Sequence, residues 1–404
     1  MGLLFQNELH DEFGAWPLGY IPWGGADFGE VRAVGKAVGN GDDGAYYDAW
    51  MQAGSRVEAE AEAALAAGRV TTARAGFLRA ACFFSSSYRP LFGAPVDPRL
   101  RAAFARQMAA FDRGLALGDR PVSPTPIPFN GAMMPAYLLP GVGRETEVRP
   151  LLILTNGYDG TITDMYFASA VAATRRGYHC LVFDGPGQGG MLFEQGVAMR
   201  PDWEAVVAAA VDFALAQPIV DPDRIALNGW SLGGHLCLRA ATGERRLAAV
   251  IADPGLCGIT APLRGAALKF GFSEAEAAAI MRGDAELANR FGEMLVGTSP
   301  KMRWGIVQRA FWVHGVSDFA GYLAAASAFT LDGRAEAIRC PALLTAAEED
   351  VLSRTAGQVL EALTCPKTLI RFTSTEGAGD HCEMGNRSLL NSRTLDWLDA
   401  TLGI

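Results

Sequence analysis

The sequence has 404 residues, half of them hydrophobic, and its 44 acidic against 35 basic residues give a formal net charge of −9. An acidic chain without a block of Lys and Arg lacks the positive surface that binds nucleic-acid phosphates. The most apolar segment, Val206 to Leu215, contains Asp212 and is much shorter than the about 20 residues that cross a bilayer. We therefore expect a folded protein that acts on a small molecule, with neither a nucleic acid nor a membrane as partner.

The N-terminal residues and the cysteines predict in which cellular compartment the protein is found. The segment MGLLFQNELHDEF has no basic region followed by an apolar stretch, so we expect no secretory signal. The seven cysteines are scattered and include no Cys-x-x-Cys pair. This pattern favours reduced thiols in a cytoplasmic protein over a disulfide framework or a metal site.

The first part of the chain is predicted to be a helical domain, residues 1–120. It is rich in Ala, Glu and Arg, with one helical stretch that ends at Gly68 and another that starts near Thr71. Four prolines within residues 121–128 exclude a helix there. We place the domain boundary at this segment, so that residues 121–404 form the second domain.

After this boundary, short apolar runs alternate with helical segments. Such runs are typical of buried strands in an α/β fold with a mainly parallel sheet and helices on both faces. The gap from Leu256 to Arg339 has helical character and no strand signal, and we predict that it is a lid over an active site. The six runs are Leu151–Leu154, Cys180–Phe183, Ile225–Leu227, Ala249–Ala252, Ala342–Leu344 and Leu369–Phe372.

A nucleophile motif follows the third run. Gly229-Trp230-Ser231-Leu232-Gly233 matches Gly-x-Ser-x-Gly, and a helix-compatible segment comes after it. The bare pattern occurs by chance, but the strand before it and the helix after it make it specific. We predict that Ser231 is a nucleophile on a sharp turn, with a serine in an ordinary strand-to-helix turn as the alternative.

A serine nucleophile needs a base, and in this arrangement an acid and then a histidine follow it along the chain. Among five histidines, His381 is favoured because it lies in a glycine-rich loop directly after the last run, whereas His314 falls inside the predicted lid. A purely structural histidine at this place is the alternative. The acid is expected after the fifth run, where spacing favours Asp350 over Glu348 and Glu349.

Two backbone N–H groups are needed to stabilise the oxyanion of an acyl-transfer reaction. One is expected from Leu232, the residue after the nucleophile. The other is expected from Tyr158, because Gly157 stands where the chain must turn off the first predicted strand.

A glycine-rich segment, residues 184–190, also matches the Gly-x-Gly-x-x-Gly pattern of dinucleotide sites. Such a site needs a helix that opens at the third glycine, and residues 191–200 show no helical pattern. We therefore predict no NAD site and no other cofactor.

Five short segments carry a family resemblance: Phe183–Gly189, Ser231–Gly234 and Gly379–Cys382, with Ala64–Ala67 and Arg79–Ala81 in the helical domain. They resemble motifs of a subgroup of α/β-hydrolases that carries an N-terminal helical domain. The likeness extends over nearly the whole chain, and the subgroup includes the bacterial 2,6-dihydroxypseudooxynicotine hydrolase and fungal polyketide-shortening hydrolases. It implies a Ser231/Asp350/His381 triad that cleaves carbon-carbon bonds in β-dicarbonyl-like substrates as well as esters. Residues 156–159, Asn-Gly-Tyr-Asp, depart from the Gly-Gly loop of the nicotine enzyme, so substrate preference is open.

The leading hypothesis is a cofactor-free serine hydrolase that cleaves a carbon-carbon or ester bond in a cyclic, aromatic or polyketide-like small molecule. The alternatives are an acyltransferase or cyclase with the same triad, and a non-catalytic binding or regulatory protein on the same fold. The sequence is also compatible with a homodimer. Candidate substrate-binding residues are Asp159, Trp230, Asp253, Trp304, Phe311, Trp312 and Tyr322.

Overall fold

The central element of the computed structural model is a seven-stranded sheet with the order β3-β5-β4-β6-β7-β8-β9. The structure describes residues 3–260 and 262–404; residues 1, 2 and 261, the last of them inside the predicted lid, are outside it. β3 is antiparallel to β5, and the other neighbours in the sheet are parallel. The strands are β3 (Ala136–Leu139), β4 (Arg149–Thr155), β5 (His179–Phe183), β6 (Val220–Trp230), β7 (Ala249–Asp253), β8 (Ala342–Ala347) and β9 (Lys367–Phe372).

All six predicted runs lie in strands of this sheet, so the predicted α/β fold with a mainly parallel sheet is confirmed. The sequence did not indicate β3, or the small hairpin of β1 (Ile127–Phe129) and β2 (Ala132–Met134). These three strands have only three or four residues each, which is too short for a clear alternation of apolar and polar positions.

Both faces of the sheet are covered by helices. Leu151 and Ile153 of β4 belong to the core that includes side chains of α10 and α11, whereas Leu152 and Leu154 belong to the core that includes side chains of α8 and α19. Successive side chains of a strand point to opposite faces, which explains the continuous apolar runs. The helices of this region are α7 (Ile162–Met165), α8 (Val171–Arg175), α9 (Gly189–Phe193), α10 (Trp203–Leu215), α11 (Leu232–Ala241), α18 (Ala356–Ala362) and α19 (Arg387–Leu402).

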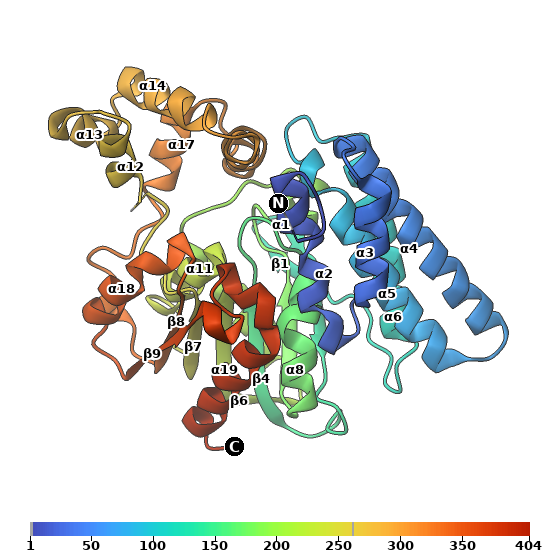
Figure 1. Cartoon of the computed structure of the whole chain (residues 1–404). Coiled ribbons are helices and arrows are strands. Elements are labelled where there is room, and N and C mark those ends of the chain that lie inside the picture. Colours follow the sequence, from blue (N-terminus) through green and yellow to red (C-terminus); the bar gives the residue numbers. More distant parts are fainter. Residues whose placement is uncertain (1–2, 261) are drawn as a thin grey trace.

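The N-terminal region is helical, as predicted, and its side chains pack into the same two cores as the sheet. Figure 1 shows its helices in blue and cyan beside the sheet. A buried ion pair joins it to α7, with Nη2 of Arg89 2.7 Å from Oδ2 of Asp164. The domain boundary near residue 120 remains a prediction. The helices are α1 (Glu8–Gly14), α2 (Trp16–Gly19), α3 (Phe28–Val38), α4 (Asp43–Ala66), α5 (Val70–Ser87) and α6 (Pro98–Ala116).

The insertion between β7 and β8, residues 256–339, consists mainly of helices that project from the rest of the molecule at the top of Figure 1. Most of its apolar side chains form a small core of their own. Trp304, Trp312 and Val313, however, belong to the main core and anchor the insertion. Its helices are α12 (Leu263–Lys269), α13 (Glu274–Met281), α14 (Ala285–Val296), α15 (Pro300–Arg303), α16 (Phe311–His314) and α17 (Phe319–Ala326), with a π-helical segment, η4 (Trp304–Ala310), between α15 and α16.

No helix in the described parts of the chain is both long enough and apolar enough to cross a membrane.

Candidate active site

Ser231 lies at the tight turn between β6 and α11. Its φ of 62° and ψ of −125° form a conformation that non-glycine residues rarely adopt. The turn closes because glycines flank the serine. A Cβ on Gly229 would lie 1.8 Å from the carbonyl oxygen of Gly233, and a Cβ on Gly233 would lie 2.6 Å from that of Thr155. The two motif glycines therefore allow the strained turn that exposes the serine hydroxyl.

The structure brings the three predicted residues into one chain of hydrogen bonds. Nε2 of His381 is 2.9 Å from Oγ of Ser231, and Nδ1 of His381 is 2.9 Å from Oδ2 of Asp350. Asp350 lies in the turn after β8, which ends at Ala347, and His381 begins a short helical turn after β9. Glu348 and Glu349, the alternative acids, instead accept hydrogen bonds from the main chain and hydroxyl of Ser374.

The two ionisable partners shift each other's pKa. Burial alone would lower the pKa of His381, but the hydrogen bond and the charge of Asp350 outweigh it and raise this pKa above its ordinary value. Burial would raise the pKa of Asp350, but the bond from His381 and those from Leu352 and Ser353 lower it. Asp350 is therefore an anion that orients the imidazole and stabilises its protonated form.

The other four histidines have partners elsewhere. Burial lowers the pKa of His235 and of His314 to about 4 each, so both are neutral at neutral pH. The partners are Asp43 for His10, the main chain of Gly141 and Glu147 for His179, the carbonyl oxygen of Leu256 for His235, and the hydroxyl of Tyr158 for His314.

The loop of residues 156–160, which leaves β4, lies directly against the turn of residues 229–233, here called the nucleophile turn because it holds the predicted nucleophile. A Cβ on Gly157 would be 2.7 Å from the nitrogen of Leu232 and 2.9 Å from Cβ of Ser231. The N–H of Tyr158 donates to no acceptor among the residues that the structure describes. Leu232 is the first residue of α11, so its N–H has no partner within the helix. Both predicted donors are therefore available beside Ser231.

Gln188 fixes the main chain of this loop. Its Nε2 donates to the carbonyl oxygen of Asn156 at 2.6 Å and to that of Gly157 at 3.3 Å. In a trans peptide the N–H points away from the carbonyl oxygen, so the N–H of Tyr158 is directed away from Gln188. Gln188 is itself held, because its Oε1 accepts from the N–H of Gly185 at 3.0 Å.

One prediction about the glycine-rich segment was wrong. We expected no helix within residues 191–200, but α9 begins at Gly189 and includes residues 191–193. The carboxylate of Asp184 accepts from the N–H of Gly190 at 3.1 Å and stabilises this short helix at its start. A Cβ on residue 189 would lie 1.9 Å from the same carboxylate, which explains why this residue is a glycine.

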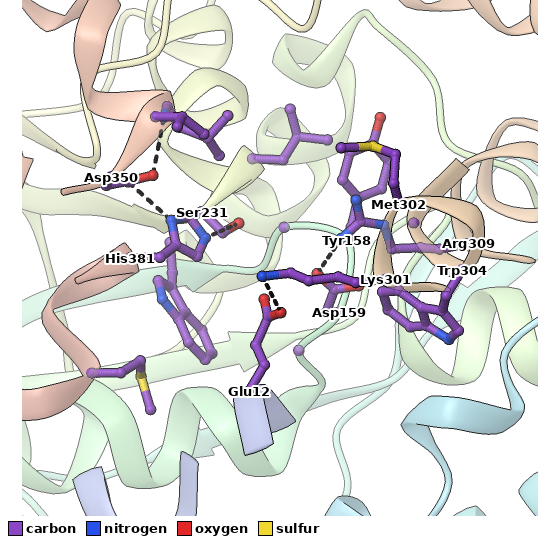
Figure 2. Close-up of a pocket in the computed structure, with 18 of the residues that line it drawn as sticks. Glu12, Tyr158, Asp159, Ser231, Lys301, Met302, Trp304, Arg309, Asp350 and His381 are labelled. Atoms are coloured by element: carbon purple, nitrogen blue, oxygen red, sulfur yellow. Dashed lines mark hydrogen bonds and ion pairs between the residues drawn. The ribbon is translucent and has the colours of Figure 1, made fainter. Parts of the chain in front are cut away.

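Ser231 and His381 open into a cavity of about 570 Å³, a volume typical of small-molecule sites. The residues that line it come from α1, α2, the 156–160 loop, the nucleophile turn, the insertion, and the segments after β8 and β9 that hold Asp350 and His381. Figure 2 shows the hydrogen-bonded Ser231 and His381 on one side, and Arg309 and Trp304 across the cavity. Its apolar lining includes Trp16, Trp230, Leu256, Ile259, Met302, Trp304, Tyr322 and Met384.

Most of the candidate substrate-binding residues line this cavity, namely Asp159, Trp230, Trp304 and Tyr322. Trp312 does not. It stacks on Phe193 at 5.3 Å between ring centroids, and with Phe311 it lines a separate hollow.

Asp253 is also outside the lining, because its carboxylate is buried below the nucleophile turn. Oδ2 of Asp253 pairs with Nη1 of Arg387 at 3.2 Å, and Oδ1 accepts from the hydroxyl of Thr345 at 2.9 Å. Its carbonyl oxygen accepts from the N–H of Ser231. The prediction that Asp253 binds the substrate is therefore wrong. The side chain of the last residue in a strand can point into the core instead of into the site.

Comparison with known proteins identifies the family. Residues 152–387 match the family model described as "Alpha/beta hydrolase family". The chain belongs to the alpha/beta hydrolase family. This hydrolase is 31% identical to "Hydrolase LUC6" of Fusarium sp, with 96% of this chain and 95% of the relative covered, and 31% identical to "20-hydroxy-prefusarin hydrolase FUS2" of Gibberella moniliformis, with the same coverage.

The fold of the hydrolase also matches a solved structure over most of its length. The crystal structure of 2,6-dihydroxy-pseudo-oxynicotine hydrolase superposes with a TM-score of 0.72 at 21% identity, covering 95% of each chain. The predicted family, including its resemblance to fungal hydrolases, is therefore confirmed, and so is the predicted fold class.

Three charged residues of the hydrolase cavity, Glu12, Lys301 and Arg309, were not predicted from the sequence. Nζ of Lys301, in α15, is 2.7 Å from Oε2 of Glu12, in α1, and Nη1 of Arg309 is 2.8 Å from Oδ2 of Asp159. Figure 2 shows both pairs. Each pair joins segments that are far apart in the chain, so no local motif could have revealed it.

Among residues 3–260 and 262–404, no three His, Cys, Asp or Glu side chains are grouped as a metal ion would require. The seven cysteines are unbridged.

Proposed function

We propose that this hydrolase uses Ser231 as nucleophile, His381 as general base and acid, and Asp350 as the residue that orients the imidazole. Its substrate would be a cyclic, aromatic or polyketide-like small molecule in which it cleaves a carbon-carbon bond next to a carbonyl, or an ester bond. The observation that carries the proposal is the hydrogen-bonded chain from Asp350 through His381 to Ser231, with both distances at 2.9 Å.

The chemistry follows from this geometry. Nε2 of His381 takes the proton of the Ser231 hydroxyl while Oγ attacks the substrate carbonyl carbon. The resulting oxyanion is stabilised by the N–H groups of Leu232 and Tyr158. His381 then gives its proton to the leaving group, which departs with the electron pair of the broken bond. A water molecule, deprotonated by His381, attacks the acyl-enzyme, releases the acid and restores Ser231.

The same steps cleave an ester or a β-dicarbonyl compound. In the first case the leaving group is an alkoxide; in the second it is an enolate, whose charge is delocalised onto the second carbonyl. The aromatic lining of the cavity, with Trp16, Trp230 and Trp304, favours a flat unsaturated substrate. The relative named 20-hydroxy-prefusarin hydrolase supports a small organic molecule of secondary metabolism as substrate.

The decisive experiment is labelling with a fluorophosphonate, which reacts with activated serines. We expect stoichiometric labelling of the wild type and none of Ser231→Ala, with mass spectrometry placing the label on Ser231. A folded wild type that stays unlabelled would exclude the proposed triad and leave a binding protein on the hydrolase fold. For the reaction type, benzoylacetone and p-nitrophenyl esters are incubated with the protein. Two products whose masses add up to the substrate plus one water indicate hydrolysis, an unchanged mass indicates cyclisation, and an ester of an added alcohol indicates acyl transfer.

A further inference from the structure

Two consecutive side chains of the 156–160 loop are bonded to the insertion. The hydroxyl of Tyr158 lies 2.6 Å from Nε2 of His314, at the end of α16. The next residue, Asp159, forms its ion pair with Arg309, in η4. Because burial keeps His314 neutral, with a pKa of about 4, its Nε2 can accept the bond from the tyrosine hydroxyl.

Arg309 is held firmly from several directions. Its guanidinium carbon is 5.0 Å from the ring centroid of Tyr158 and 5.2 Å from that of Trp304, within the range of cation–π attraction. Trp304 is fixed in turn, because its Nε1 donates to the carbonyl oxygen of Arg89 at 3.0 Å. The Arg309 side chain therefore connects the 156–160 loop to a buried anchor. It lies in a π-helical segment, a feature that is frequent at functional sites.

The loop thus has two kinds of support. Gln188 binds the carbonyl oxygens of Asn156 and Gly157, the residues before Tyr158. The N–H groups of Tyr158 and Asp159 donate to no acceptor among the described residues, so beyond Gly157 the side-chain bonds to Arg309 and His314 hold the loop. A shift of the insertion would change the position of the Tyr158 N–H.

We propose that Arg309 and His314 are positioning residues, which act through Asp159 and Tyr158 to direct the Tyr158 N–H at the reaction oxyanion. This inference rests on the proposed function. Loss of one oxyanion donor lowers the rate by about 10²–10³-fold, and a misplacement of about 1 Å can lower it by about 10²-fold. Loss of either the Arg309–Asp159 ion pair or the His314–Tyr158 hydrogen bond should lower the labelling rate by about 10-fold. Loss of both contacts should lower it by about 10²-fold.

The experiment measures the second-order rate constant of fluorophosphonate labelling, which needs no knowledge of the substrate and forms an adduct with an oxygen at the oxyanion position. We expect Arg309→Met and Asp159→Asn each to label about 10-fold more slowly than wild type. The double variant should be no slower than either single variant, because both remove the same contact. His314→Gln and Tyr158→Phe form a second, matched pair and should behave in the same way.

The control variant is Arg264→Met, which removes an exposed ion pair with Glu274 within the insertion, outside the cavity lining. It should label at the wild-type rate. Arg309→Lys, which retains the charge, should recover part of the lost rate. The labelling rate is also followed against pH, because the midpoint reports the His381 base: a positioning role lowers the plateau and leaves the midpoint unchanged. Far-ultraviolet circular dichroism checks that each variant is folded.

The possible outcomes separately test the positioning role, its route through Asp159, and the proposed triad. If folded Arg309→Met and Asp159→Asn label as fast as Arg264→Met, the positioning role is overturned, although the triad stands. If the two substitutions act additively, or shift the pH midpoint, Arg309 does not act through Asp159. If the folded wild type itself does not label, the proposed function is overturned, and with it the positioning role, which requires a reactive Ser231.

Discussion

Replacement of Gly157 by alanine tests the relation between the 156–160 loop and the nucleophile turn. The new methyl group would lie 2.7 Å from the nitrogen of Leu232, 2.9 Å from Cβ of Ser231 and 3.0 Å from the carbonyl oxygen of Trp230. Ordinary contacts start near 3.4 Å, so the loop and the turn must separate by several tenths of an ångström. Two of the three atoms belong to the main chain, so no side chain can rotate to make room.

This displacement acts directly on the geometry between the Tyr158 N–H and Ser231. Since a shift of about 1 Å lowers rates by about 10²-fold, we expect Gly157→Ala to slow fluorophosphonate labelling by about 10–100-fold. Overpacking of this kind also destabilises proteins by about 1–3 kcal/mol, which urea unfolding will show.

The matched control is Gly265→Ala, in α12 of the insertion, where an added Cβ meets no atom within 4 Å. It should keep the wild-type labelling rate and stabilise its helix by about 0.5–1 kcal/mol. A Gly157→Ala protein that labels as fast as Gly265→Ala would refute the assignment of the Tyr158 N–H as an oxyanion donor.

Three further predictions concern the acid, the pH dependence and the packing of the N-terminal helices. His381 must be neutral to accept the serine proton, and Asp350 raises its pKa, so labelling should fall as the pH drops through a midpoint above the ordinary histidine value of about 6.5. Asp350→Asn removes the anion that raises this pKa and orients the ring. The midpoint should therefore move to lower pH and the plateau rate should fall by about 10⁴-fold; an unchanged midpoint would show that Asp350 is not the partner. Arg89→Met leaves the carboxylate of Asp164 buried without its cation, so the free energy of unfolding in urea should fall by about 3–5 kcal/mol, whereas a loss below 1 kcal/mol would contradict a buried pair.

The sequence was enough to group Ser231, Asp350 and His381, the residues of the proposed triad, because the signals of all three are local. Ser231 stands between a strand and a helix with glycines on both sides, and the turn needs those glycines for steric reasons that any such turn shares. Asp350 and His381 each follow a short apolar run, and the ends of parallel strands meet at one edge of the sheet. Chain order and strand position therefore sufficed to bring the three together.

The rest of the cavity could not be predicted, because it depends on contacts between distant segments. Whether Asp253 faces the site or the core is decided by Arg387, which is 134 residues away in the sequence and pairs with it. Trp304 and Trp312 belong to the same helical stretch, but only the first points into the cavity. A sequence pattern shows that both are large and apolar, not which neighbour each will meet.

This difference explains why the sequence points to a reaction mechanism more directly than to a substrate. The residues of the proposed triad follow strands of the sheet, whose geometry is shared by the whole fold. The opposite side of the cavity is built from three separate parts of the chain, with Glu12 from α1, Asp159 from the loop after β4, and Lys301 and Arg309 from the insertion. The charged groups there are paired with one another, so a substrate that carries a net charge would have to break an existing pair, whereas a neutral carbonyl or hydroxyl group can bind beside them. Neutral, flat, carbonyl-bearing compounds are therefore the first substrates to assay.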